Sequence, residues 1–368
     1  MKRREMSGGD ATTKPTAAGP GEAAVTSRFG LPGQFRFASH LLPAALLILA
    51  VALAGVLVPS FLTIRNELLL LQQMAIIGVV AIGMHYVILT AGIDLSVGSI
   101  LELSTVIFAL ALAGGWPLGL ALAAALAAGL AAGLVNGLCV TLLNVQPFVV
   151  TLATLAIFGG LALLVTNGTP VLITNKSPVM DFLGNGDYGG IPGQFILLMV
   201  LAFIGWFVLR FTPFGRYVYA VGGSAETARL AGIRVKLVLT SVYAIAGLCA
   251  GLAGIMTAAR LSTGTPTAGS LTNLDAIAAV VIGGTSLMGG RGSLWASVAG
   301  ALTLAVIANI IVLLGFSPFQ AQIIRGVIIL VAVALGAVSL TRASRSSSTR
   351  EPPSGGGLAP SPGEETLK

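Results

Sequence analysis

The sequence predicts an all-α fold, a polytopic membrane bundle of about ten transmembrane helices. The chain of 368 residues is 55% hydrophobic and only 9% charged, whereas ordinary soluble domains carry about 25% charged residues. Between Phe37 and Leu209 only seven residues are charged, so long segments offer water little to solvate and must lie in lipid. Because the lipid interior cannot satisfy free backbone N–H and C=O groups, these segments are expected to be helices.

Ten apolar segments are candidate spans, since a helix needs about 20 residues to cross the hydrocarbon core. Alternating strands of about ten residues, typical of a membrane barrel, are absent from the sequence. In order along the chain the spans are residues 41–58, 68–89, 96–114, 117–142, 148–166, 194–210, 237–258, 274–289, 293–314 and 319–340.

The distribution of Lys and Arg predicts the orientation of these spans. Sixteen of the 20 basic residues lie before the first span, within 210–236, at Arg291 or after the last span. Positively charged loops stay in the cytoplasm during insertion, so both termini are predicted to be cytoplasmic. The net charge of +7 is explained by these loops facing anionic lipid headgroups, which predicts contact with membrane lipid and not with nucleic acid.

Composition divides the chain into three regions. Residues 1–36 and 342–368 are rich in Gly, Ser, Pro and Thr, and they are predicted to be disordered cytoplasmic tails because they cannot bury enough apolar surface. Residues 37–341 are predicted to form the transmembrane domain. The charged start "MKRRE" is followed by polar sequence, so it does not resemble a cleavable secretion signal.

Small residues recur every four positions in two of the predicted spans. Gly129, Gly133 and Gly137 do so in the fourth span, and Gly247 and Gly251 do so in the seventh. This spacing places the glycines on one face of each helix, where they allow two helices to approach closely. We expect them to pack the bundle.

The sequence has no nucleotide-binding or catalytic motif of its own. The stretch "GGTSLMGGRGS" has the glycine spacing of a phosphate-binding loop, but Gly290 and Arg291 stand where Lys and Ser or Thr are required. The two histidines and two cysteines lack the spacing of a metal site or a catalytic triad. They are His40, His85, Cys139 and Cys249. We therefore expect that the chain is not an enzyme and binds no metal or cofactor directly.

Two segments interrupt the predicted spans with glycine and polar residues near the cytoplasmic side. They are "TAGIDLSVGS" (90–99) and "VIGGTSLMGGRGS" (281–293). Broken helices at corresponding places in two halves point to a transport pathway, because unwound backbone is tolerated only where it lines a cavity or is buried in protein. In the first segment, Asp94 is predicted to cap the third span by accepting N–H bonds from Ser96 or Val97. The alternative is that Asp94 contacts a cytoplasmic partner or a gate.

Glu102 is an unexpected charge, because it lies two turns into a predicted span, where a charge costs roughly 2.5–3.5 kcal/mol. It either faces the interior of the bundle as a hydrogen-bonding group or lies close enough to the interface to reach water. Several neutral amides are suited to hydrogen bonding with hydroxyl groups, and each of them either lines a path or bonds two helices together. The candidate translocation path is Gln72, Gln73, Glu102, Asn136, Asn144 and Gln146.

The segment 212–236, between the sixth and seventh spans, is predicted to contain a short cytoplasmic surface helix. Its "SAETARLAGI" core begins with Ser224 as the N-cap, and Gly232 ends it. Such a helix has no core of its own to join, so its exposed side requires another protein. A transporter without a phosphate-binding loop needs a separate ATPase, which is the candidate partner.

Four stretches resemble one family, and they occur in its order: "AGIDLSVGS" (91–99), "NGLCVTLLNVQPFVVTLATL" (136–155), "TPFGRYVYAVGGSAETARLAGI" (212–233) and "AAVVIGGTSLMGGRGSLWASVAGAL" (278–302). They are similar to the membrane-permease subunits of bacterial ribose/xylose/galactose-type ABC importers. The resemblance covers roughly residues 40–340. Branched-chain amino-acid and nucleoside permeases are related, but the form "GIDLSVGS" resembles the sugar branch.

The resemblance implies a homodimeric or paired permease of the bacterial plasma (inner) membrane that imports a monosaccharide, a pentose or hexose such as ribose or xylose. It also implies a cytoplasmic ATPase that binds ATP and Mg²⁺ and an extracytoplasmic sugar-binding protein. The fold it implies has interrupted helices and a cytoplasmic coupling helix. Glu102 stands where an apolar residue is expected in the family, which leaves its role open.

Carried over residue by residue, the resemblance assigns ATPase coupling to Ser224, Ala225, Glu226, Thr227, Ala228, Arg229, Leu230, Ala231 and Gly232. The family motif at the cytoplasmic helix ends corresponds to Gly92, Asp94, Ser96, Gly98, Ser99, Gly289, Gly290 and Arg291.

Two alternatives to a sugar importer stay open. One is a secondary transporter driven by an ion gradient, with Asp94 or Glu102 as its ion site, and the other is a permease of the same family for another small polar solute. The longest outer stretch, 167–193, is expected either to contact the sugar-binding protein or to form a solvated lid.

Overall fold

The computed structural model describes most of the predicted transmembrane domain. The described residues are 48–49, 51–52, 54–56, 58–174, 177–317, 319–324, 326–327 and 330. The two predicted tails, and much of the first and last predicted spans, lie outside these residues.

Six helices in the described part of the chain are long and apolar enough to cross a membrane. They are α2 (Ile64–Leu89), α4 (Leu118–Leu142), α5 (Pro147–Thr166), α7 (Gly193–Phe211), α10 (Val235–Leu261) and α12 (Leu294–Leu313). Two shorter apolar helices accompany them, α3 (Val97–Ala113) and α11 (Thr272–Ile282). The protein is therefore a polytopic helical membrane protein, as its composition predicts.

The prediction of an eighth span over 274–289 is wrong in its second half. Helix α11 has only 11 residues and ends at Ile282. The following residues turn, because Gly284, Gly289 and Gly290 adopt positive φ angles of 78°, 80° and 70°. Glycine reaches this conformation without a steric penalty, so the apolar glycine-rich stretch forms a folded loop instead of extending the helix.

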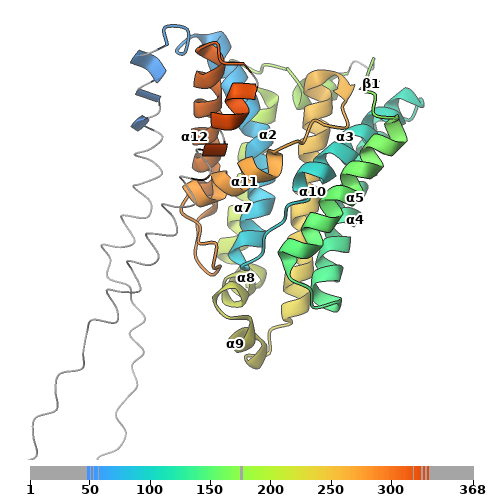
Figure 1. Ribbon diagram of the computed structural model, residues 1–368, viewed down its shortest axis with the longest axis vertical. Helices are drawn as coiled ribbons and strands as arrows, with labels where there is room; N and C mark the ends of the chain where they lie inside the picture. Colours follow the sequence, from blue (N-terminus) through green and yellow to red (C-terminus); the bar gives the residue numbers. More distant parts are fainter. Residues whose placement is uncertain are drawn as a thin grey trace, which may run out of the picture.

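Helices α3 and α11 each follow a non-helical segment that re-enters the bundle (Figure 1). After α2, residues 90–96 lead back inward to α3, and after α10 and strand β2 (Thr263–Gly264), residues 265–271 lead to α11 from the opposite end. The N-terminal ends of α3 and α11 meet, since a Cβ built on Gly98 would lie 2.6 Å from the carbonyl oxygen of Gly269. We call this meeting point of Gly98, Glu102 and Gly269 the crossing. The counterpart of the first interruption is therefore 265–271, and not the predicted 281–293.

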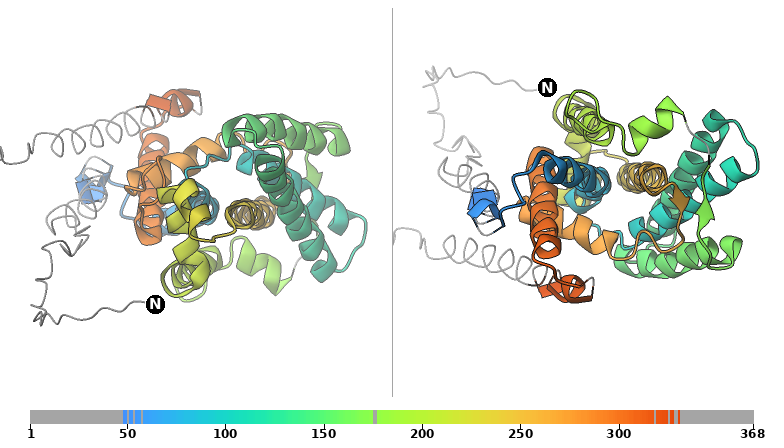
Figure 2. Two further views of the ribbon diagram at one scale, coloured as in Figure 1. Left: turned by 90° about the horizontal axis from the view of Figure 1, so that it is seen from below. Right: turned by 90° about the horizontal axis from the view of Figure 1, so that it is seen from above.

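Helix α10 occupies the centre of the described bundle and contacts α2, α3 and α4. Seen from either end, it lies end-on between the α3–α5 group and the group that contains α2, α11 and α12 (Figure 2). The predicted glycine faces account for its close approach to α4, because a Cβ on Gly129 would lie 2.5 Å from the carbonyl oxygen of Gly247. The packing role expected for these glycines is confirmed.

The two ends of the bundle carry different elements (Figure 1). At one end, β1 (Val171–Leu172) pairs antiparallel with β2, and helix α6 (Pro178–Leu183) follows β1 in the chain. At the other end, α8 (Pro213–Gly223) and α9 (Ala225–Leu230) lie between α7 and α10. The long stretch 167–193 thus has secondary structure that the sequence did not predict, and it lies at the end opposite α9.

Candidate functional site

Helix α9 begins and ends where its sequence predicts. The hydroxyl of Ser224 accepts a hydrogen bond from the backbone N–H of Thr227 at 3.2 Å, as an N-cap residue does. At the other end, Gly232 has a φ of 83°, and the N–H of Ile233 donates to the carbonyl of Ala228 at 3.0 Å. This left-handed glycine satisfies the last carbonyls of the helix. The predicted cap and terminator of the helix are confirmed.

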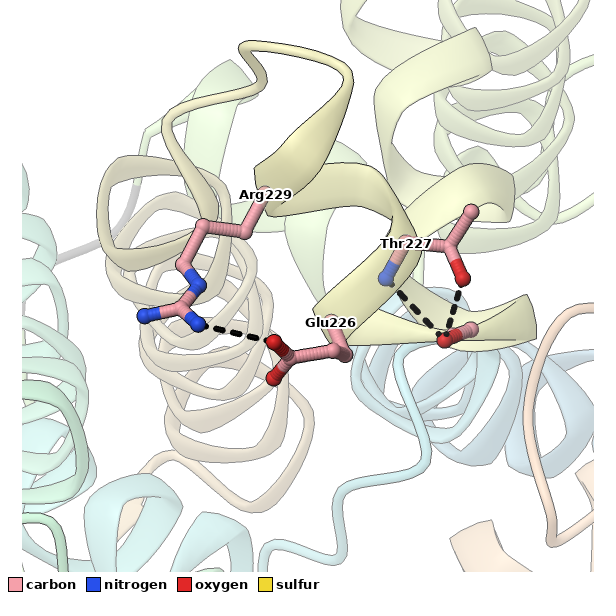
Figure 3. A network of polar contacts seen from close by, with 4 residues as sticks. Glu226, Thr227 and Arg229 are labelled. Carbon is pink, nitrogen blue, oxygen red and sulfur yellow. Dashed lines mark hydrogen bonds and ion pairs between the residues drawn. The ribbon is translucent and has the colours of Figure 1, made fainter.

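The outer side of α9 is exposed and carries an ion pair (Figure 3). Arg229 donates to Glu226 at 2.8 Å, and these side chains are 68% and 71% exposed. Leu230 is 79% exposed, whereas Ala228 is 4% exposed and faces the bundle. An exposed ion pair contributes about 1 kcal/mol or less to stability. The pair and the neighbouring leucine therefore form a surface that the fold itself does not need.

Helix α8, which is not among the elements predicted from the sequence, connects α9 to the bundle. Thr212 caps it by accepting from the N–H of Gly215 at 3.3 Å, and Pro213 occupies the first turn. This Thr-Pro pair is a helix-start signal that could have predicted it. Burial raises the pKa of Tyr219, so its phenol stays protonated and donates to the carbonyl of Gly292 at 3.0 Å.

The loop 283–292 joins α8 to the end of α2. The N–H of Gly290 donates to the carbonyl of Leu89 at 2.9 Å, and a Cβ on Gly222 would collide with the same carbonyl. Gly289 packs against the backbone of Gly222, whereas Arg291 is exposed. A movement of α8 would therefore be transmitted directly to α2 and to the re-entrant segment 90–96 that follows it.

Asp94 forms the centre of a buried polar network beneath this contact. Its Oδ1 accepts from the N–H of Ser96 at 2.9 Å and from the hydroxyl of Ser96 at 2.7 Å, and Asn136 donates to the same hydroxyl at 2.7 Å. The predicted bond from Ser96 is confirmed, although Ser96 itself occupies the N-cap position of α3. Asp94 is completely buried, so it is not available to a cytoplasmic partner in this structure.

The other motif residues of this segment serve close packing. A Cβ on Gly92 would lie 2.7 Å from the hydroxyl of Tyr243 in α10, and the hydroxyl of Ser99 donates to the carbonyl of Ser96 at 2.9 Å. Together with Gly98 at the crossing, these residues lie inside the bundle. Gly289, Gly290 and Arg291, by contrast, lie at the α9 end.

Glu102 lies in the interior of the bundle and not at its end. It is 8% exposed, and its Oε1 accepts from the N–H of Gly269 at 3.2 Å and from the hydroxyl of Ser270 at 3.4 Å. Of the two alternatives for this carboxylate, the geometry favours an interior hydrogen-bonding group over a group at the interface.

The other candidate path residues are not brought together with Glu102. Gln72 and Asn136 are buried, and Gln73 is half-buried in α2. Asn144 and Gln146 are exposed in the loop between α4 and α5. The six residues therefore do not form one lining.

Two polar contacts across α2 had no sequence signal, because their members are far apart in the chain. His85 lies 2.8 Å from the hydroxyl of Ser297 and 3.2 Å from that of Thr285. Asn66 and Asn309 exchange two amide hydrogen bonds of 2.9 Å and 2.8 Å. Both contacts tie α2 to α12 or to the loop before it.

A cavity of about 390 Å³ lies between α8 and the start of α10, beside α9. Its lining includes Phe214, Tyr217, Ile233, Arg234 and Leu237. Within the described residues, no three His, Cys, Asp or Glu side chains come close enough to hold a metal ion.

Comparison with known proteins identifies a family match over most of the chain. The matching family is described as "Branched-chain amino acid transport system / permease component", and its model matches residues 66–333. No solved structure matches the chain.

Individual relatives are similar over nearly their full lengths. The ribose import permease protein RbsC of Bacillus subtilis (strain 168) is 44% identical over 289 residues, which cover 78% of this chain and 90% of the relative. The ribose import permease protein RbsC of Escherichia coli (strain K12) is 42% identical over 291 residues, with the same coverage of 78% and 90%. The fructose import permease protein FrcC of Rhizobium meliloti is 37% identical over 307 residues and covers 80% of this chain and 84% of the relative.

Proposed function

Since this chain belongs to the family of ABC-transporter permease components and is not an enzyme, we propose that it carries a monosaccharide into the cytoplasm, driven by a separate ATPase subunit. The ribose and fructose import permeases among its relatives support a pentose or hexose as the solute. Xylose, which the sequence motifs suggested, is a further candidate.

The single observation that carries this proposal is the free outer side of α9. Glu226, Arg229 and Leu230 are exposed on a helix whose inner side is attached, through α8, to α2 and to the loop 283–292. An ATPase bound to this surface would move α2 and the loop 283–292, which lie next to the re-entrant segments. We propose that residues 224–232 form the contact with the ATPase, which binds ATP and Mg²⁺.

The charge distribution of the two ends supports a cytoplasmic position for α9. Two basic residues of the described chain, Arg65 and Arg260, lie near the β1–β2 end of the bundle. The α9 end carries six, which are Arg210, Arg216, Arg229, Arg234, Lys236 and Arg291. Because positive loops stay in the cytoplasm, we propose that α9 and both termini face the cytoplasm of the plasma (inner) membrane.

The opposite end is then available to a sugar-binding protein outside the membrane. The stretch 167–193 lies there and includes Tyr188 and Ile191, which are 45% and 44% exposed. We propose that this surface receives the loaded binding protein. A second copy of the permease completes the transporter, with lipid covering the remaining apolar surface.

The direct test is reconstitution of this chain in liposomes with an ABC ATPase subunit and a sugar-binding protein from the same organism. We expect binding protein loaded with D-ribose, D-xylose or D-fructose to stimulate ATP hydrolysis and to deliver that sugar into the lumen. Stimulation by none of these sugars, but by another small polar solute, would keep the permease assignment and replace the substrate.

The same liposomes distinguish the alternative of a secondary transporter driven by an ion gradient. Uptake that persists when the ATPase is inactivated, but collapses when an uncoupler is added, supports that alternative. Uptake that requires ATP and ignores the uncoupler supports the ABC mechanism.

The ATPase contact is tested by exchanging the charges of α9. The double variant Glu226→Arg/Arg229→Glu keeps the net charge and an ion pair but reverses its direction, so the partner meets the opposite pattern. We expect stimulated ATP hydrolysis and sugar uptake to fall together, while the amount of folded permease stays the same. Normal coupling in this variant would contradict the assigned interface.

A further inference from the structure

Glu102 lies in the interior of the bundle, at the crossing of the two re-entrant segments. Helix α3 rises about 1.5 Å per residue, so Glu102 lies about 17 Å from the end of that helix at Ala113. The hydrocarbon core is about 30 Å thick, so a helix end at Ala113 that lies at the membrane surface would place the carboxylate near the middle of the core. A charge at that depth is expensive, and charges in such places mark the paths of ions and solutes.

The second re-entrant segment stabilises this carboxylate. The N–H of Gly269 and the hydroxyl of Ser270 both donate to Oε1, and these residues come directly before helix α11. The N-terminal end of a helix carries a partial positive charge, so the carboxylate lies where negative charge is favoured. Glu102 thereby attaches α3 to the segment 265–271.

Part of this segment is open, in contrast to the first one. Thr267 and Ser270 are exposed in the single chain, whereas Asp94 and Ser96 of the segment 90–96 are fully buried. Irregular backbone at membrane depth does not face lipid, because its polar groups require water or protein. The open side of 265–271 therefore faces either water or another protein surface in the assembled transporter.

Helix α5 leaves room beside the same carboxylate. A Cβ built on Gly159 would lie 3.8 Å from Oε2 of Glu102, and a Cβ on Gly160 would meet nothing within 4 Å. At Gly159, therefore, no side chain of α5 covers the second carboxylate oxygen of Glu102.

We propose that Glu102, Thr267 and Ser270 form a hydrogen-bonding wall of the solute path, and that Glu102 determines which solutes pass. One carboxylate oxygen positions the segment 265–271, and the other accepts hydrogen bonds from the hydroxyl groups of a polyhydroxylated solute. Ser and Thr hydroxyls both donate and accept, so this wall suits a sugar better than an apolar solute. The solute class rests on the proposed function, whereas the wall itself rests on the geometry of the crossing.

The first test measures which side chains water reaches. Single cysteines replace Thr267, Ser270 or Ser104 in a chain that also carries Cys139→Ala and Cys249→Ala, and the assembled transporter is treated with a charged, membrane-impermeant methanethiosulfonate. Ser104 is the matched control, because it lies on α3 with 0% exposure and packs beside Gly251 and Gly254 of α10. We expect Thr267→Cys and Ser270→Cys to react and to lose uptake, and D-ribose in the transport cycle to slow their reaction. Reaction rates equal to that of Ser104→Cys would overturn the proposed wall.

The second test separates selection of the solute from folding. Glu102→Leu removes both the charge and the acceptor, whereas Glu102→Gln keeps an oxygen that can accept from Gly269. We expect Glu102→Leu to lower the sugar imported per ATP hydrolysed by about tenfold, as one lost bond to a charged group does, with stimulated ATP hydrolysis retained. Glu102→Gln should recover part of that loss, and Ser104→Ala should transport like the parent.

The outcome for the parent chain keeps this inference separate from the proposed function. If the parent imports D-ribose, D-xylose or D-fructose with ATP, but Glu102→Leu imports it with an unchanged ratio of sugar to ATP, only the role of Glu102 is refuted. If the parent itself imports none of these sugars, the proposed sugar substrate fails, and the accessibility of Thr267 and Ser270 still tests the wall.

Discussion

The crossing and helix α9 are both polar regions in an apolar chain, but their side chains bond in opposite ways. At the crossing, Glu102 bonds to Gly269 and Ser270, which are 167 and 168 positions away in the sequence. In α9, Glu226 bonds to Arg229, only three positions away, and both side chains are exposed. The polar groups of the crossing therefore join distant elements, whereas the charged groups of α9 bond to one another.

This difference indicates that the interior polar groups stabilise the fold and that the exposed groups of α9 serve a partner. Substitutions in the interior remove contacts between elements, so they should lower the free energy of unfolding. Substitutions on the outer side of α9 remove little from the fold, so their effect should appear only when a partner is present. Four sets of variants test this division, from the largest expected effect on stability to the smallest.

The largest effect is expected for Gly269→Ala at the crossing. The added Cβ would collide with the carbonyl oxygen of Gly98 and would lie 3.1 Å from Cγ of Glu102, and neither backbone can retreat without moving a helix. Overpacking of this kind costs about 1–3 kcal/mol or more. Thermal unfolding in detergent measures the loss. Gly160→Ala is the control, because its Cβ meets nothing within 4 Å and should leave stability nearly unchanged.

A smaller loss is expected for Asp94→Ala in the buried network. The substitution leaves the N–H and hydroxyl of Ser96 without their acceptor, and a lost partner in a buried site costs about 1–3 kcal/mol. Asp94→Asn keeps the Oδ1 acceptor, so the same unfolding measurement should show a smaller loss for it. Equal losses in the two variants would show that the hydrogen bonds to Ser96 are not the cause.

A local effect is expected for Ser224→Ala. Loss of an N-cap costs about 1 kcal/mol, and here it weakens only the short helix α9. Hydrogen exchange of the amides in 225–230 should accelerate, while exchange in α10 stays at the parent rate. Faster exchange throughout the bundle would mean that α9 supports the fold more than its exposure indicates.

The smallest effect on stability is expected for the double variant Glu226→Ala/Arg229→Ala. The lost ion pair is exposed, so the free energy of unfolding should change by less than about 1 kcal/mol. ATP hydrolysis stimulated by loaded binding protein should nevertheless fall. A variant that unfolds more easily but keeps the stimulated ATP hydrolysis would show that this ion pair stabilises the fold and does not serve the ATPase contact.

The sequence predicts α9 well because all its signals are local. The cap at Ser224, the glycine at 232 and the charges between them lie within nine residues. Most of the membrane helices are predicted equally well, since the length of their apolar segments alone identifies them. The span predicted over 274–289 extended seven residues too far, into the loop 283–292, because hydropathy does not distinguish a buried glycine-rich loop from a span.

The crossing could not be predicted in the same way. Its second half, "TGTPTAGSLTN" (263–273), has the composition of a surface loop, and no local signal indicates that it enters the bundle. Only the packing of α3 against the start of α11 brings Gly98 to Gly269. Glu102 was therefore recognised as unusual from the sequence, but its partners required the three-dimensional structure.

The most direct test of the proposed ATPase contact is a site-specific photo-crosslink from the exposed leucine of α9. A photoreactive amino acid replaces Leu230, which is 79% exposed, and in a second variant it replaces Ile191, which is 44% exposed at the other end of the bundle. In the assembled transporter, the variant at Leu230 should form an adduct with the ATPase, and the variant at Ile191 should not. An ATPase adduct from Ile191, with none from Leu230, would contradict the assignment of α9 as the surface on which the motor acts.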